Sequence, residues 1–135
     1  MRILSALVVA IGMAVVATAA MADPEEQWPR KDSLEAKVYR GSIVFTHYCS
    51  LCHGVTAEGN GRAARLYTPR PANLVLSEKN DAYKELIIRR GGEAMGRSQF
   101  MPPWGKELTD EQIADVIAYL HSINRYKEEK PEKTE

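Results

Sequence analysis

Apolar residues recur at spacings of three and four in three stretches of this chain, which is the periodicity of amphipathic α-helices. The pattern predicts helices over residues 34–49, 81–90 and 110–124. The buried face of the third helix would hold Ile113, Val116, Ile117, Leu120 and Ile123. The sequence shows no clear alternation of apolar and polar residues, which would mark a half-buried strand. The pattern therefore predicts an all-α fold with three main helices.

Polar residues at the expected helix starts support these boundaries. Thr109 and Gln112 have the spacing of a capping box, in which each side chain accepts a hydrogen bond from the backbone N–H of the other residue. The first helix leaves two alternatives open: Asp32 with Glu35 as a capping box, or Ser33 as a single cap. Both place the start of this helix near residue 34.

A long loop rich in glycine and proline separates the first two predicted helices. Pro69 and Pro71 hold part of it extended, and residues 63–67 can form one short helical turn. An irregular loop of this length is unusual in a compact domain. Such a loop needs a bound group on which to pack.

The first 22 residues have the features of a secretory signal. Arg2 supplies a positive charge, residues 3–16 are apolar, and Ala22 ends a small-residue cleavage site. We expect residues 1–22 to be removed on export. The alternative is an uncleaved membrane anchor, because residues 3–22 form an uncharged stretch of 20 residues, just long enough to span a bilayer.

The 113 residues that remain after cleavage fit one small domain. We expect an irregular lead over residues 23–33, the folded domain over 34–124 and a charged flexible tail over 125–135. Without the signal, the chain has 17 basic and 18 acidic residues. This balance argues against nucleic-acid binding, for which a strongly basic domain is expected.

Cys49, Cys52 and His53 form a C-x-x-C-H sequence, the attachment signature of c-type haem. Each thiol can add to one vinyl group of the haem, and the adjacent histidine then lies under the iron. A zinc half-site would need further ligands, yet these are the only two cysteines of the chain. A redox dithiol belongs in a βαβ context, which the helical pattern does not offer. We therefore expect one haem c, bound covalently through Cys49 and Cys52.

The order of features resembles the class I monohaem cytochromes c, specifically small bacterial members with His and Met ligands. A Gly-x-x-x-Phe helix, here with Gly41 and Phe45, leads into the haem motif, and a Met-Pro-Pro-Trp segment at residues 101–104 precedes the last helix. The resemblance covers residues 35–123. It implies a cytochrome c fold, in which a long loop wraps the haem. It also favours a close contact of Tyr119 with Gly41. The alternative is that Tyr119 is a half-exposed helix residue.

His53 and Met101 are the expected axial ligands of the iron. Of the five methionines, three lie in the signal, which leaves Met95 and Met101. Met101 precedes two prolines that stiffen its loop, and a thioether ligand favours Fe(II) and raises the potential. His47 and His121 are rival ligands that we expect to lie at the surface.

Two further residues are expected beside the cofactor. In the resembling family a proline carbonyl accepts the ring N–H of the ligand histidine. Pro69 and Pro71 both lie in range, and Pro71 is the choice. Trp104 would pack on the haem, donate its indole N–H to a propionate, or simply fill the core.

Charge is spread unevenly along the chain. Residues 62–97 hold eight basic and four acidic residues, whereas residues 98–135 hold five basic and eight acidic ones. One interpretation is a basic rim, with Lys79 and Lys84 among its exposed members, that steers an acidic redox partner. The other is an ordinary solvated surface in which some arginines pair with haem propionates.

These features predict a monomeric periplasmic protein that carries one electron between a donor and an acceptor protein. A six-coordinate iron offers no position for a substrate, so we do not expect an enzyme. One alternative is a cytochrome subunit or domain of a larger respiratory or dehydrogenase complex. Another is a haem sensor or catalyst whose methionine leaves the iron to admit a small ligand such as carbon monoxide.

Overall fold

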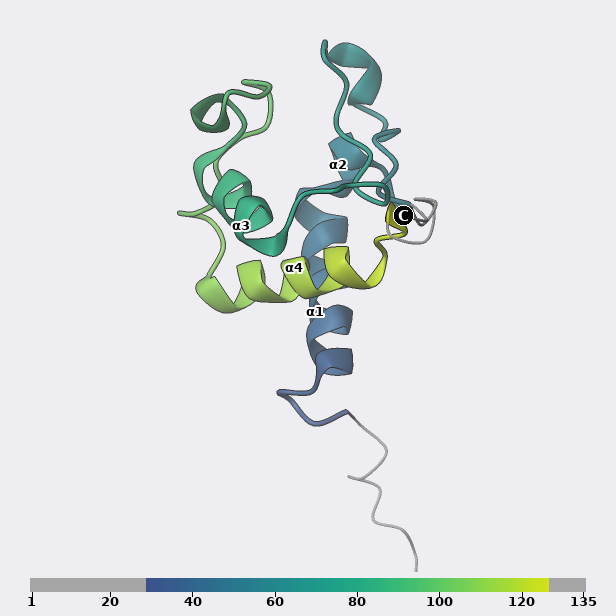
Figure 1. Cartoon of the computed structure of the whole chain (residues 1–135), viewed down its shortest axis with the longest axis vertical. Helices are drawn as coiled ribbons and strands as arrows, with labels where there is room; N and C mark the ends of the chain where they lie inside the picture. Colours follow the sequence, from purple (N-terminus) through teal and green to yellow (C-terminus); the bar gives the residue numbers. More distant parts are fainter. Residues whose placement is uncertain (1–28, 127–135) are drawn as a thin grey trace, which may run out of the picture.

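A computed structural model describes residues 29–126 of the chain (Figure 1). This part is helical and contains no strand, which confirms the predicted all-α fold. The elements are α1 (Leu34–Tyr48), α2 (Ser50–His53), η2 (Ala64–Leu66), α3 (Asp81–Arg90), η3 (Glu93–Met95) and α4 (Asp110–Ser122). Within the described range, no helix is long and apolar enough to cross a membrane. The predicted signal at residues 1–22 and most of the predicted tail lie outside it.

The helix caps follow the sequence closely. Ser33 caps α1 by accepting a hydrogen bond from the backbone N–H of Ala36 at 3.1 Å, which decides between the two alternatives for this helix. Asn80 caps α3 in the same way. At the start of α4, Thr109 and Gln112 make both bonds of the capping box, at 3.2 and 2.9 Å.

The core of the domain forms where α4 crosses α1 (Figure 1). The side chains of Phe45, Ile113 and Val116 are almost completely buried there, with 1 % of each exposed. The ring of Tyr119 lies against that of Phe45, with 5.3 Å between the centroids. Val75, Ile88 and Leu108 extend the same apolar cluster toward the loops.

Gly41 allows the two helices to approach this closely. A Cβ at this position would collide with the backbone carbonyl of Asp115 and lie 2.9 Å from the Cβ of Tyr119. This confirms the expected contact between Gly41 and Tyr119. The distance between α1 and α4 is therefore set by a residue without a side chain.

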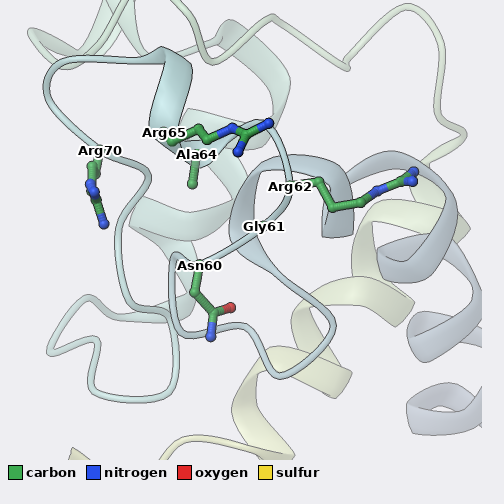
Figure 2. Close-up of a pocket in the computed structure, with 6 residues that line it drawn as sticks. All are labelled: Asn60, Gly61, Arg62, Ala64, Arg65 and Arg70. Atoms are coloured by element: carbon green, nitrogen blue, oxygen red, sulfur yellow. The ribbon is translucent and has the colours of Figure 1, made fainter.

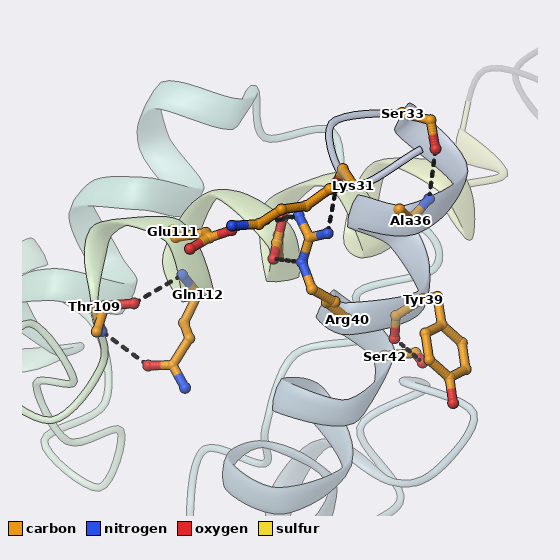
Figure 3. A network of polar contacts seen from close by, with 10 residues as sticks. Lys31, Ser33, Ala36, Tyr39, Arg40, Ser42, Thr109, Glu111 and Gln112 are labelled. Atoms are coloured by element: carbon orange, nitrogen blue, oxygen red, sulfur yellow. Dashed lines mark hydrogen bonds and ion pairs between the residues drawn. The ribbon is translucent and has the colours of Figure 1, made fainter. Parts of the chain in front are cut away.

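A buried ion pair ties the same two helices together, and the sequence pattern did not reveal it. Arg40 binds the carboxylate of Asp115 with two nitrogens, at 2.6 Å from Nε and 3.0 Å from Nη2. Only 4 % of the Asp115 side chain is exposed. Arg40 also donates to the carbonyl of Lys31 at 2.7 Å and lies 3.7 Å from Glu111 (Figure 3). The fork geometry fixes the rotation of α4 about its axis relative to α1.

The chain beyond α4 is held against the long loop. The helix ends at Ser122, two residues before the predicted end. The side chain of Asn124 donates to the carbonyl of Ser77 at 2.7 Å, and the N–H of Arg125 donates to the carbonyl of Val75 at 2.8 Å. Residue 125, the first of the predicted flexible tail, is thus still bound to the domain.

Replacing Gly41 with alanine should lower the stability of the protein. The new Cβ would force α1 and α4 apart, and overpacking of this kind costs about 1–3 kcal/mol. Thermal unfolding of the holoprotein measures the effect. Ser42→Ala, on the neighbouring position of the same helix, is the control and should leave the midpoint nearly unchanged. Equal midpoints for both variants would contradict the role given to Gly41.

Candidate haem-binding site

The three residues of the C-x-x-C-H sequence lie on one helical turn at the end of α1. Cys49 is the C-cap residue of α1 and the N-cap residue of α2. Its carbonyl accepts hydrogen bonds from the N–H groups of Cys52, at 3.2 Å, and His53, at 2.9 Å. Both cysteines are half-buried and carry free thiols. The turn therefore presents two thiols and an imidazole within one short segment.

The thiol of Cys49 lies in surroundings that keep it protonated. Burial raises its pKa to about 12, and the neighbouring Cys52 adds to the shift. Redox dithiols work through a thiolate with a lowered pKa. The environment of Cys49 thus disfavours the redox-dithiol alternative.

His53 is prepared to bind a metal through one nitrogen. Its Nδ1 lies 3.0 Å from the carbonyl oxygen of Ala72. A carbonyl only accepts, so Nδ1 carries the proton and Nε2 keeps its lone pair. Burial lowers the pKa of His53, and the bond to Ala72 opposes this shift only in part. The ring is therefore neutral at pH 7, the form that coordinates iron.

The carbonyl that binds His53 belongs to Ala72, so the choice of Pro71 as the acceptor is wrong. The Pro71 carbonyl faces Gly59, where an added Cβ would collide with it. Successive carbonyls of an extended segment point to alternate sides, so the neighbouring residue supplies the acceptor. A backbone carbonyl occurs at every residue, and no residue type in the sequence marks this one.

The loop that carries Met101 rests on the two glycines that end α3. The N–H of Gly92 donates to the carbonyl of Met101 at 2.9 Å. A Cβ on Gly91 would lie 3.0 Å from that carbonyl oxygen, and one on Gly92 would lie 3.2 Å from the Cβ of Met101. The absence of side chains on Gly91 and Gly92 therefore lets the Met101 loop (residues 96–104) lie directly on the end of α3.

Trp104 connects the Met101 loop to the end of α1. Its backbone N–H donates to the carbonyl of Ile88 at 2.8 Å. Its ring stands edge-on to that of Tyr48, with 5.4 Å between the centroids. Tyr48 directly precedes Cys49. Cys49, Met101 and Trp104 are all partly buried against the same apolar cluster, so the fold brings the two predicted ligand segments to one place.

The rival ligands lie elsewhere, as expected. His47 is exposed, and its Nδ1 lies 2.9 Å from the carbonyl of Ile43 on its own helix. The side chain of His121 is 71 % exposed and lies 3.5 Å from Asp81. Met95 sits in η3 and is not among the side chains packed on the core.

The residues present fit a covalently attached haem. They offer two thiols at the required spacing, a neutral histidine with a free Nε2, and a thioether on a separate loop. No cluster of three or more His, Cys, Asp or Glu residues within 29–126 is arranged to hold a metal ion instead.

The basic segment divides into paired and unpaired charges. Lys84 is buried, with its Nζ 3.1 Å from Asp81, so its expected place on an exposed rim is wrong. Its partner Asp81 lies on the same helix, and 10 % of the Lys84 side chain is exposed. Arg89 is bound at 2.8 Å to both Glu85 and Asp110.

Five arginines of this segment form no ion pair in the described part of the chain: Arg62, Arg65, Arg70, Arg90 and Arg97. Arg62, Arg65 and Arg70 line an open hollow of about 390 Å³ together with Asn60, Gly61 and Ala64 (Figure 2). We refer to these residues as the arginine hollow. The N–H of Gly61 donates to the carbonyl of Cys52 at 3.1 Å. The arginine hollow therefore lies on a segment in direct contact with the haem motif.

Comparison with known proteins gives curated relatives that are much longer than the matched region. The chain is 30 % identical over 91 residues to the Cbb3-type cytochrome c oxidase subunit CcoP of Azospirillum sp. (strain B510). It is 26 % identical over 88 residues to the protein of the same description from Azospirillum brasilense. These alignments cover 64 % and 65 % of this chain, but only 29 % of each relative.

Among solved structures, the chain is similar to one in the Kuenenia stuttgartiensis reducing HAO-like protein complex Kustc0457/Kustc0458. The TM-score is 0.57 at 29 % sequence identity, over 67 % of this chain and 44 % of that chain. The family model described as Cytochrome c matches residues 38–124, a range that contains the haem motif, the Met101 loop and α4. The chain thus belongs to the cytochrome c family.

Proposed function

We propose that this protein transfers single electrons between redox proteins by means of one haem c bound through Cys49 and Cys52. His53 and Met101 would be the ligands of its iron, and Trp104 would contact the cofactor. The observation that carries this proposal is the turn at Cys49–His53, whose imidazole is neutral and directed by Ala72. Membership of the cytochrome c family supports electron transfer in place of catalysis on a substrate.

The residues around the proposed ligands are suited to keeping them still. When bound, haem c supplies an iron that changes between Fe(II) and Fe(III). The Ala72 carbonyl holds the His53 ring in one orientation. The backbone of Met101 is held by Gly92, and two prolines follow it. Ligands that move little between the two oxidation states keep the barrier to electron transfer low.

The periplasm is the proposed location. The signal features of residues 1–22 support export, and covalent haem attachment takes place outside the bacterial cytoplasm. If residues 3–22 stay in place, they would anchor the same domain to the membrane. In either case the folded part acts as a monomer in our proposal.

A second candidate function is that of an electron-transfer subunit fixed in a larger complex. The relatives favour it, since two are described as oxidase subunits and the similar structure is that of a complex. Native gel electrophoresis of membrane and periplasmic extracts, stained for haem, distinguishes the two. A band at the size of the single chain supports the carrier, and a band only in a large assembly supports the subunit.

The arginine hollow is the proposed docking surface for an acidic redox partner. Its three guanidinium groups form no ion pair within the described residues, and no acidic residue lines the hollow. The exposed side chains of Leu51 and Leu66 belong to the same region, because the N–H of Ala63 donates to the carbonyl of Leu51 at 3.0 Å. Arginine is enriched in protein interfaces relative to the rest of the surface. A partner bound here would lie next to the backbone of Cys52.

Covalent attachment should survive extraction with acidified acetone. The thioether bonds to Cys49 and Cys52 keep the haem with the protein pellet, and the double change Cys49→Ser with Cys52→Ser should release it to the solvent. Ser50→Ala, inside the same turn, is the control and should retain the haem. Haem that leaves the unmodified protein would refute the attachment.

Met101→Ala should abolish the weak sulfur-to-iron absorption band of the oxidised protein and lower the reduction potential. The thioether favours Fe(II), so its loss stabilises the oxidised state. Met95→Ala is the matched control and should keep the band. The assignment fails if the Met95 variant loses the band and the Met101 variant keeps it.

Removing the three charges of the arginine hollow should slow electron transfer with the natural partner about tenfold at low salt. Arg62, Arg65 and Arg70 are each changed to glutamine, and the rate is measured from low to high ionic strength. The unmodified protein should slow as salt rises, because exposed charges are screened over about 10 Å at 0.1 M. The variant should show little salt dependence.

A charge-matched control removes three exposed cations on other parts of the surface, Arg30, Lys37 and Lys106, by the same change to glutamine. This control should keep most of the rate and of the salt dependence. A haem spectrum that changes in the arginine variant, with an unchanged rate, would instead assign these side chains to the haem propionates.

A further inference from the structure

Two aromatic rings join the segment after the haem motif to the segment before Met101. The rings of Tyr67 and Phe100 are stacked, with 4.8 Å between their centroids and 30° between their planes. Tyr67 directly follows η2, and Phe100 directly precedes Met101. Phe100 is nevertheless 47 % exposed, so the stack is not part of the buried core.

The Met101 loop is anchored unequally on its two sides. After Met101, backbone hydrogen bonds fix the chain: Trp104 donates to Ile88 at 2.8 Å and Gly105 to Arg89 at 3.2 Å. Before Met101, one backbone bond, from the N–H of Arg97 to the carbonyl of Gly92 at 2.7 Å, reaches outside the loop, and side chains make the other connections. Arg97 donates from Nε to the hydroxyl of Tyr83 at 3.1 Å, and Phe100 stacks on Tyr67.

The local bonds of the two residues nearest to this side of the ligand, Phe100 and Met101, are long. The N–H of Met101 reaches the carbonyl of Ser98 at 3.3 Å, and the N–H of Phe100 reaches the Ser98 hydroxyl at the same distance. These lengths lie beyond the usual range for N–H···O bonds. The Tyr67–Phe100 stack is therefore the contact nearest to Met101 that ties this side of the loop to the haem-motif side.

We propose that the Tyr67–Phe100 stack keeps the sixth coordination position closed by holding the Met101 thioether in place. The two aromatic residues are positioning residues and bind neither the iron nor a substrate. This inference rests on the proposed function, in which Met101 is a ligand. Without the stack, the segment before Met101 moves away more readily, the thioether leaves, and a small neutral ligand takes its position.

The expected size of the effect follows from the strength of an aromatic pair. Such a pair changes an equilibrium constant by about two- to twelvefold beyond the burial of its surface. The chain offers variants that separate the stack from simple loss of apolar volume. Phe100→Leu and Tyr67→Leu keep apolar side chains without a ring, whereas Phe100→Tyr keeps the ring.

The test is carbon monoxide binding to the reduced holoprotein, followed by absorption spectroscopy at neutral pH. Phe100→Leu and Tyr67→Leu should each raise the binding constant about two- to twelvefold. The double variant should raise it no further than either single change, since both remove the same contact. Phe100→Tyr should bind carbon monoxide as weakly as the unmodified protein.

Tyr39→Leu is the control for an exposed aromatic residue, because Tyr39 on α1 is 67 % exposed and pairs with no other ring among residues 29–126. It should leave the binding constant unchanged. Single variants that bind like the unmodified protein, or effects that simply add in the double variant, would overturn the proposal. If the unmodified protein binds carbon monoxide as strongly as Met101→Ala does, the proposed function itself fails, because Met101 is then not a ligand.

Discussion

The close crossing of α1 and α4 at Gly41 is the contact on which the rest of this structure depends. Since no side chain separates the helices there, the carbonyl of Asp115 and the Cβ of Tyr119 lie directly on α1. The crossing fixes the end of α1, where the haem motif begins. It also fixes the start of α4, into which the Met101 loop leads. The two predicted ligand segments are far apart in sequence, and this one contact brings both to the same apolar cluster.

The helices and their caps could be predicted because their signals are local. Ser33, Asn80 and Thr109 each cap a helix within three residues of themselves, so a short stretch of sequence contains the whole interaction. The haem motif is equally local, since its three side chains lie within five residues. The contact of Gly41 with Tyr119 is different, since it was expected only from the family resemblance and joins two distant parts of the sequence.

Features that depend on tertiary contacts could not be predicted in this way. The acceptor for the ring N–H of His53 is a backbone carbonyl. Ala72 supplies it and Pro71 does not, although the two residues are neighbours in an extended segment. Lys84 carries a charged side chain, which is expected at the surface, yet it is buried because it lies on the face of α3 that packs inward. The Arg40–Asp115 pair joins residues 75 positions apart, and charged residues are too frequent in a sequence for such a pairing to be evident.

The two sides of the proposed haem site are built from different kinds of contact. On the histidine side, backbone hydrogen bonds dominate: Gly59 donates to His53 at 2.7 Å and Gly61 to Cys52 at 3.1 Å. Substitutions that leave the backbone in place hardly affect such bonds. On the methionine side, one backbone bond holds Arg97 to Gly92, and the contact closest to Met101 is made by the side chain of Phe100. A single substitution there can change how firmly the sixth position is closed, while attachment through the cysteines remains. The fold thus separates the permanent bond to the cofactor from the ligand that sets its reactivity.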